Sequence, residues 1–204
     1  MLRAARAGGA SALLRVDSSR PESLKRALDL GPDGVVVPHV ASAEEARRVV
    51  RACRYPHDGG VRGVAFPVIR ASMYGTDPTY LAEYQGRTLV LPQIEDAAGV
   101  AEADGILGED GVDGVFLGPL DLSSSVGHPG DVRHPDVAAA TSAIEAAARR
   151  HGKLVCGFAA GGAGEARRLL GPGGYDLVAG AVDLGLLRAA AVADVGEARG
   201  RGPQ

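Results

Sequence analysis

The sequence predicts an α/β protein in which helices cover a parallel β-sheet. Short apolar segments alternate with amphipathic segments along the chain. The apolar segments are continuous runs and not alternating patterns, which is typical of parallel strands that are buried on both faces. The chain has 204 residues, of which 46% are hydrophobic and 23% charged. We therefore expect one globular domain over residues 1–204.

The expected strands are runs rich in Val, Leu and Ile, and an amphipathic segment follows each of them. The strands are residues 12–16, 34–40, 88–94, 114–117, 154–158 and 177–181. The helices are residues 2–7, 21–30, 42–53, 97–107, 135–151, 164–170 and 184–195. This order of elements predicts βα units, of which about six are present where a full barrel needs eight.

Local signals support the helices that follow the first two strands. Pro21 suits a first helical turn, and Leu24 and Leu28 lie one turn apart on an apolar stripe. Ser42 with Glu45 three residues later predicts a capping box.

Two stretches without a clear period are expected to be long loops, and a third to be a tail. Residues 54–78 are rich in Gly and Pro, and so are residues 119–135. Loops of this length in compact domains are often lids or binding loops. Residues 196–204 are expected to form a disordered tail.

The pattern by itself fits two architectures, a doubly wound sheet and a (β/α) barrel. No G-x-G-x-x-G fingerprint follows the first strand, which counts against dinucleotide binding. The net charge of −3 gives no electrostatic footprint for nucleic acid or for an anionic membrane. No apolar run approaches the ~20 residues of a membrane span.

The cysteine content and the first residues bear on localisation. Cys53 and Cys156 are too few for a disulfide framework and lack metal-ligand spacing, so a cytoplasmic protein is expected. Residues 1–16 contain three arginines and no acid, a composition that superficially resembles a mitochondrial presequence. We prefer the interpretation that residues 2–7 end a helix.

Two carboxylates stand out at the expected carboxyl ends of neighbouring strands. Glu95 and Asp121 lie 26 residues apart, which is one βα unit. Such a pair, completed by water and a bidentate ligand, suits Mg²⁺ or Mn²⁺. The alternative is that each acid caps the helix that follows it.

Several segments together resemble the HpcH/HpaI aldolase and citrate lyase family. They are Gln93-Ile94-Glu95, the run from Gly111 to Ser123, Gly127-His128-Pro129-Gly130, Tyr55-Pro56 with Val61-Arg62-Gly63-Val64, Ala43-Glu44-Glu45-Ala46-Arg47, and Gly180-Ala181-Val182-Asp183. The match keeps its order from about residue 2 to residue 195. It implies a partial TIM-type (β/α) barrel.

The resemblance also implies roles for individual residues. Glu95 and Asp121 match the metal ligands, and Gln93 matches a substrate-contacting glutamine. Gly118, Pro119, Leu120 and Asp121 match the turn that receives the keto-acid carboxylate. Arg15 matches the arginine that stabilises the enolate, and Asp29 matches an acid that raises the basicity of a catalytic histidine.

The activity that follows from the resemblance is a class II aldolase reaction. A 4-hydroxy-2-oxo acid would be cleaved to pyruvate and an aldehyde through a metal-bound enolate, with Mg²⁺, Mn²⁺ or Co²⁺ as the cofactor. The substrate is a small 2-oxo acid and a homo-oligomer is expected. The alternatives are a truncated or non-catalytic relative that binds metal or keto acid, and a lyase of citryl- or malyl-CoA type. Lys25 and Lys153 are poorly placed for a Schiff base, which favours metal chemistry.

The start of the chain departs from the family pattern. Two further strands and the catalytic histidine would precede residue 12, so a weak or inactive aldolase is expected from these 204 residues. Of the five histidines, His39 ends a strand and is the first candidate for the base. Two less specific hypotheses are that Gly157–Gly164 cradles a phosphate, and that Arg62 and Arg70 contact a distal substrate carboxylate.

Overall fold

The computed structural model describes residues 1–159 and 162–200. The chain divides into two compact units, residues 1–156 and residues 157–204, which are described separately below. The expectation of a single domain therefore stays a prediction.

The strands form a parallel sheet whose order follows the sequence. They are β1 (Leu13–Arg15), β2 (Gly34–Val37), β3 (Leu89–Ile94), β4 (Gly114–Leu117), β5 (Leu154–Phe158) and β6 (Leu177–Ala179), paired in the order β1-β2-β3-β4-β5-β6. A doubly wound sheet would reverse its order at a switch point. Six strands in an order without reversal are the arrangement of a partial (β/α) barrel, so the predicted fold class is confirmed.

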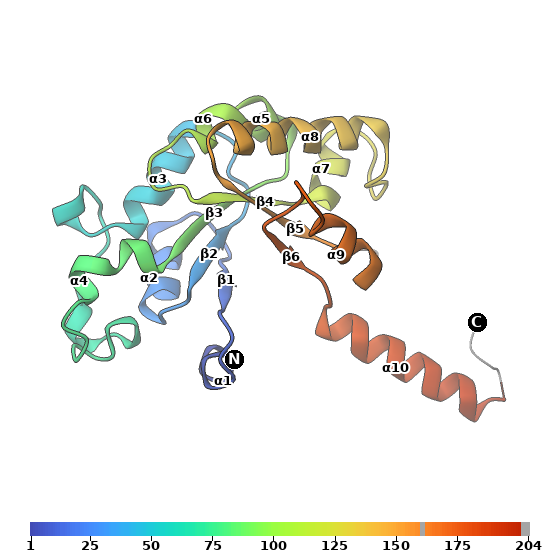
Figure 1. The fold of residues 1–204 in the computed structure, drawn as a ribbon, viewed down its shortest axis with the longest axis horizontal. Helices are drawn as coiled ribbons and strands as arrows, with labels where there is room; N and C mark the ends of the chain where they lie inside the picture. Colours follow the sequence, from blue (N-terminus) through green and yellow to red (C-terminus); the bar gives the residue numbers. More distant parts are fainter. Residues whose placement is uncertain (160–161, 201–204) are drawn as a thin grey trace. The chain divides into compact units, whose positions relative to one another are not determined.

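In the first unit, helices cover one side of the sheet. After α1 (Leu2–Ala7), these are α2 (Pro21–Asp29), α3 (Ala43–Cys53), α5 (Ala97–Ala101), α6 (Ala103–Leu107), α7 (Pro119–Ser125) and α8 (Pro135–Arg150). Helix α2 packs on α3, α3 on α6 and α6 on α8, so that neighbours in the sequence are neighbours in space (Figure 1).

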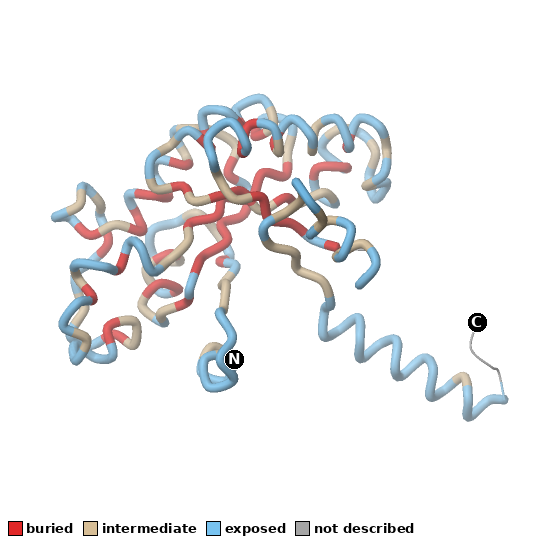
Figure 2. Tube along the Cα trace, viewed as in Figure 1, coloured by how far each residue is buried: buried red, intermediate tan, exposed pale blue. Residues whose placement is uncertain are grey.

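The core of this unit lies between the strands and the helices. Val35 and Val37 of β2, Leu91 of β3 and Val115 of β4 are fully buried. Figure 2 shows that buried positions concentrate along β2, β3 and β4. The capping box predicted at the start of α3 is present, since Ser42 Oγ accepts a hydrogen bond from the Glu45 amide at 3.2 Å.

The segment between α3 and β3 is more ordered than the predicted loop. It contains the 3-10 helices η1 (Pro56–Asp58), η2 (Phe66–Val68), η3 (Arg70–Ser72) and η4 (Gln85–Arg87), together with α4 (Tyr80–Glu83). Its buried centre is aromatic: Tyr55, Tyr80 and Tyr84 pack together with Ile69. The Tyr55 and Tyr80 hydroxyls lie 3.1 Å apart.

Two further expectations about the elements were wrong. The loop predicted from residue 119 begins with α7, because Pro119 fits the first helical turn. The helix predicted over residues 97–107 is divided into α5 and α6 at Glu102.

The second unit contains the end of β5, α9 (Ala163–Leu169), β6 and α10 (Asp183–Ala198). The Ala159 amide donates to the Ala179 carbonyl at 2.9 Å. Helix α10 continues to residue 198, so the tail predicted from residue 196 begins too early; residues 201–204 lie outside the described residues. Among the described residues, no helix is both long enough and apolar enough to cross a membrane.

Candidate active site at the carboxyl ends of β1 to β4

Four neighbouring strands of the first unit bring polar side chains to one edge of the sheet. Arg15 ends β1, His39 follows β2, Gln93 and Glu95 stand at the end of β3, and Asp121 follows β4. Parallel strands have their carboxyl ends at the same edge, which is where (β/α) barrels carry their chemistry.

Glu95 is the buried centre of this group. It is only 2% exposed. Its Oε1 accepts a hydrogen bond from the His39 amide at 3.0 Å, and its Oε2 accepts one from Nε2 of Gln93. One carboxylate oxygen is thus oriented by the residue after β2 and the other by a side chain of β3 itself, which fixes the direction in which the remaining lone pairs point.

Burial raises the pKa of the Glu95 carboxyl above its usual value, because the charged form loses hydration. The charge of Asp121 raises this pKa further, whereas His39 and Arg15 act in the opposite direction. A buried carboxylate with a second acid nearby is the kind of arrangement that a cation stabilises.

Arg15 lies beside Gln93 in the same group. Its Nε donates to Oε1 of Gln93 at 3.0 Å. Gln93 is 8% exposed and spans the space between Arg15 and Glu95. A guanidinium, an amide and a carboxylate are therefore held in one hydrogen-bonded row across β1 and β3.

The turn after β4 completes the group. A Cβ atom at Gly118 would lie 2.6 Å from Oε2 of Glu95 and 2.8 Å from Nε2 of Gln93. Only glycine leaves room for these two side chains. Pro119 then starts α7, whose first turn carries the exposed residues Leu120 and Asp121.

His39 is the histidine that the structure brings to Glu95. Its Nδ1 lies 3.2 Å from Oε1 of Glu95, and its side chain is 67% exposed. Its φ of 53° is unusual for a residue other than glycine. This conformation turns the backbone amide of His39 toward the Glu95 carboxylate, and strained residues of this kind often occur at functional sites.

Asp29 does not join the group. It ends α2, and a helix that follows a strand runs back toward the start of the sheet. Its carboxylate contacts Nζ of Lys25 at 2.5 Å and Nη2 of Arg62 at 2.9 Å. These contacts keep Asp29 apart from the residues around Glu95 within one copy of the chain, and its expected role beside a catalytic histidine stays a prediction.

The contacts of the two loop arginines lie away from Glu95, and the hypothesis that they contact a distal substrate carboxylate stays a prediction. Arg62 is 4% exposed and stacks over the Tyr55 ring at 4.7 Å. Arg70 donates to the Leu30 carbonyl, beside the end of α2. The segment that carries both arginines joins the end of a helix to the start of a strand, so it lies at the amino edge of the sheet.

A cavity of about 280 Å³ also lies at this amino edge, between the start of β3 and the residues that precede β4 and β5. Its lining includes Arg54, Arg62, Asp113 and Lys153. Lys153 donates from Nζ to the Val112 carbonyl at 2.7 Å. We do not regard this cavity as the active site, because none of the residues that surround Glu95 reaches it.

The phosphate hypothesis rests partly on residues 160 and 161, which lie outside the described residues. Both cysteines are free and buried, and burial raises the pKa of Cys53 to about 12. Such a thiol is inert at neutral pH.

Comparison with known proteins agrees with this geometry. The model of the HpcH/HpaI aldolase/citrate lyase family matches residues 1–190. The chain belongs to this family. It is therefore an enzyme of the carbon–carbon lyase class, as the sequence predicted.

Its relatives include a 5-keto-4-deoxy-D-glucarate aldolase of Salmonella arizonae, 43% identical over 183 residues, which are 89% of this chain and 70% of the relative. A solved family member from Burkholderia cenocepacia is 36% identical with a TM-score of 0.87, covering 97% of this chain and 78% of that one. The HpcH/HpaI aldolase from Desulfitobacterium hafniense is 31% identical with a TM-score of 0.81, covering 99% of this chain and 78% of that one.

Sequence reasoning missed one polar residue near the group. Ser123 is fully buried, and its hydroxyl donates to the Leu120 carbonyl at 2.6 Å. The same oxygen accepts from the Gly130 amide at 3.0 Å. A serine in the sequence is a weak signal, because only the tertiary fold shows that it joins α7 to the loop that follows.

Proposed function

We propose that this protein is a divalent-metal-dependent aldolase that cleaves a 2-oxo-3-deoxy sugar diacid to pyruvate and a hydroxy-aldehyde acid. The observation that carries the proposal is the buried Glu95 carboxylate. It is oriented on both oxygens, and Asp121 adds to the negative charge that surrounds it.

The proposed substrate class comes from the relatives. The name 5-keto-4-deoxy-D-glucarate describes a diacid with a ketone beside one carboxylate, then a methylene and then a hydroxyl-bearing carbon. Counted from the keto end it is a 4-hydroxy-2-oxo acid. Cleavage between the methylene and the hydroxyl-bearing carbon leaves a three-carbon 2-oxo acid, which is pyruvate, and a three-carbon hydroxy-aldehyde acid.

The residues at this edge fit a hard divalent cation. Carboxylate oxygens are preferred by Mg²⁺ and Mn²⁺, and burial together with the charge of Asp121 raises the Glu95 pKa when no cation is present. Glu95 and Asp121 would hold the ion. When bound, it would act as a Lewis acid toward the 2-oxo acid. Whether the ion is Mg²⁺, Mn²⁺ or Co²⁺ is part of the experiment below.

Arg15 and Gln93 would bind and orient the substrate. The guanidinium of Arg15 places positive charge where negative charge develops as the carbon–carbon bond breaks. Gln93 accepts from Arg15 and donates to Glu95, so it would fix the distance between the arginine and the metal ligand. The backbone at Gly118, Pro119, Leu120 and Asp121 would receive the substrate carboxylate, since amides of a first helical turn point outward.

His39 would act as a positioning residue. Its amide and its Nδ1 both approach Oε1 of Glu95. Partners of this kind hold a ligating carboxylate in one orientation. We do not include Asp29, because it lies at the other edge of the sheet.

A homo-oligomer remains part of the proposal. Helix α10 exposes large apolar side chains, among them Leu184, Leu187 and Val192. Exposed apolar surface of this extent often marks a contact between proteins.

The test measures pyruvate release from 5-keto-4-deoxy-D-glucarate. The full chain is stripped with a chelator and assayed alone and with Mg²⁺, Mn²⁺ or Co²⁺. We expect activity only with metal. Glu95→Gln should abolish it, and Glu83→Gln, the same change at an exposed position, should not. Release of pyruvate that persists in chelator, or that is equal in Glu95→Gln, would contradict the proposal.

A further inference from the structure

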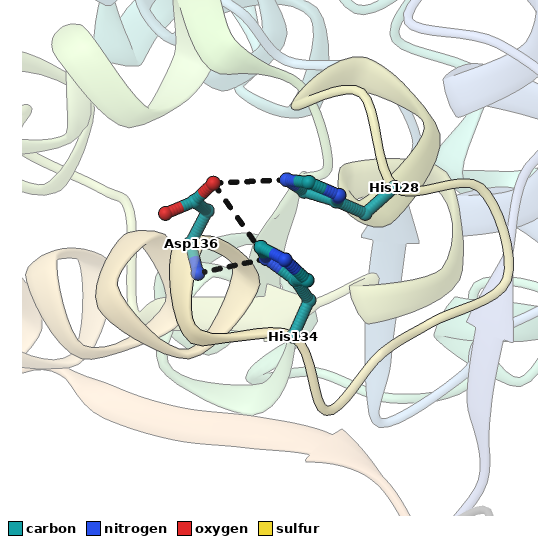
Figure 3. Close-up of side chains that lie close together, drawn as sticks. All are labelled: His128, His134 and Asp136. Atoms are coloured by element: carbon teal, nitrogen blue, oxygen red, sulfur yellow. Dashed lines mark hydrogen bonds and ion pairs between the residues drawn. The ribbon is translucent and has the colours of Figure 1, made fainter.

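We propose that His128, His134 and Asp136 form a second metal site, which binds a transition-metal dication such as Zn²⁺ or Ni²⁺. These residues stand at the two ends of the loop between α7 and α8 and in the first turn of α8. Figure 3 shows both imidazole rings pointing toward the carboxylate of Asp136. The candidate ligand atoms all lie within 4.8 Å of one another.

The spacing of the ligand atoms suits one ion. Nε2 of His128 lies 2.9 Å from Oδ2 of Asp136, and Nδ1 of His134 lies 3.6 Å from the same oxygen. Two ligands that each lie about 2.0–2.1 Å from a tetrahedral Zn²⁺ are about 3.3 Å apart. The two observed distances fall on either side of this value.

The contacts of His134 place its Nδ1 beside Asp136. The Asp136 amide donates to Nδ1 of His134 at 3.2 Å, and Oδ2 of Asp136 lies 3.6 Å from the same nitrogen. Because Nδ1 has one lone pair, an ion bound there would replace the hydrogen bond from the Asp136 amide.

The ligand set predicts which ions bind. Imidazole nitrogen is preferred by Zn²⁺, Ni²⁺, Co²⁺ and Cu²⁺, whereas Mg²⁺ prefers oxygen. Two imidazoles and one carboxylate thus differ from the oxygen ligands proposed around Glu95. The imidazole rings must also change orientation, because they stack with centroids 3.3 Å apart. One ring must turn so that the ion lies in both ring planes, and about a third of each side chain is exposed, which leaves room for this.

The loop that carries the ligands is already held in place. The His128 amide donates to the Ser123 carbonyl at 2.7 Å, and the His134 amide donates to the Asp131 carbonyl at 3.1 Å. Ser123 in turn bonds the Leu120 carbonyl in the first turn of α7. An ion between His128 and α8 would therefore brace the segment that follows the candidate active site.

The experiment measures metal binding to the full, untagged chain by calorimetry after removal of metal by a chelator. Zn²⁺ and Mg²⁺ are titrated separately into the wild type, His128→Asn, Asp136→Asn and Glu95→Gln. His57→Asn, a histidine change outside the cluster, is the control. We expect Zn²⁺ to bind the wild type, His57→Asn and Glu95→Gln at this site, and Mg²⁺ not to do so.

The variants in the cluster decide the outcome. His128→Asn and Asp136→Asn should each lose one equivalent of Zn²⁺ or weaken it at least ~10-fold, and Zn²⁺ should no longer raise their melting temperature. Circular dichroism verifies that both are folded. If both folded variants keep the full Zn²⁺ stoichiometry and affinity, or if Glu95→Gln alone removes all Zn²⁺ binding, the proposal is overturned.

Discussion

Nδ1 of His39 lies 3.2 Å from Oε1 of Glu95, and the His39 backbone amide donates to the same oxygen at 3.0 Å. His39, which follows β2, therefore makes two contacts with the buried Glu95 carboxylate at the end of β3. The left-handed backbone of His39 permits both contacts at once. This arrangement predicts what replacement of His39 should do.

Replacement of His39 should weaken the site without unfolding the chain. Asparagine tolerates the left-handed conformation, so His39→Asn keeps the backbone contact and removes the imidazole. We expect metal affinity or turnover to fall ~10–100-fold, as for other partners of ligating carboxylates. Calorimetry with Mn²⁺ and the pyruvate assay measure this, with His57→Asn as the control. Unchanged affinity and turnover would mean that the imidazole is a solvated side chain.

The raised pKa of Glu95 predicts how stability depends on pH. The native carboxyl binds its proton more tightly than the unfolded chain does, so the stability of the metal-free protein should fall as pH rises above about 4.3, the value in unfolded chains. Glu95→Gln lacks this charge. In chelator it should be more stable than the wild type near pH 8, and the advantage should vanish below about pH 4. Urea unfolding across this pH range measures the difference in stability between Glu95→Gln and the wild type. A difference that does not change with pH would show that the Glu95 charge is not its cause.

Metal should reverse this order of stability. An ion that binds only the native wild type stabilises it by about 2.7 kcal/mol at a concentration 100 times its dissociation constant. Glu95→Gln should gain much less at the same Mn²⁺ concentration. Urea unfolding with and without Mn²⁺ measures both gains, and equal gains in the two proteins would remove Glu95 from the ligand set.

Arg15→Lys should lower the turnover number more than it changes KM. Lysine keeps the charge but cannot reproduce the Nε contact with Oε1 of Gln93. Loss of a donor that stabilises developing charge typically costs ~10²–10³-fold in rate. Steady-state kinetics compare it with Arg20→Lys, an exposed arginine that also donates through Nε. If both variants turn over like the wild type, Arg15 has no part in the chemistry.

Gly118→Ala should disrupt the site through a single methyl group. The added Cβ would lie 2.6 Å from Oε2 of Glu95, so the carboxylate must move. We expect loss of Mn²⁺ affinity with a folded chain, whereas Gly86→Ala, whose Cβ meets nothing within 4 Å, should behave like the wild type. Equal metal affinity in the two variants would show that the carboxylate can shift without consequence.

Asp29→Asn should affect stability and not the chemistry. Arg62 has a side chain that is 3% exposed, and Asp29 is its charged partner. Breaking a buried pair typically costs 3–5 kcal/mol, and we expect about 3 kcal/mol because Asp29 keeps some contact with water. Urea unfolding measures this cost. A turnover number per folded molecule that falls ~10²-fold or more, the size of a general-base effect, would return Asp29 to the catalytic group.

The sequence alone was sufficient to predict most of the secondary structure and the partial barrel. Continuous apolar runs such as residues 34–37 specify buried parallel strands, because both faces must avoid water. The family motifs around Glu95 and Asp121 predicted which edge carries the polar group. These signals are local. Each depends only on the residues of one strand or helix and of the element that follows it, so the sequence is sufficient to predict it.

Only the tertiary structure decided which distant residues meet. Asp29 and Arg62 lie 33 residues apart and pair at the amino edge, because helix direction sends the end of α2 away from Glu95. His39 and Glu95 lie 56 residues apart and meet, because parallel pairing aligns the ends of β2 and β3. The spacing of motifs in the sequence does not give the direction of a helix or the register of a strand pair. These two properties determine whether a side chain reaches Glu95.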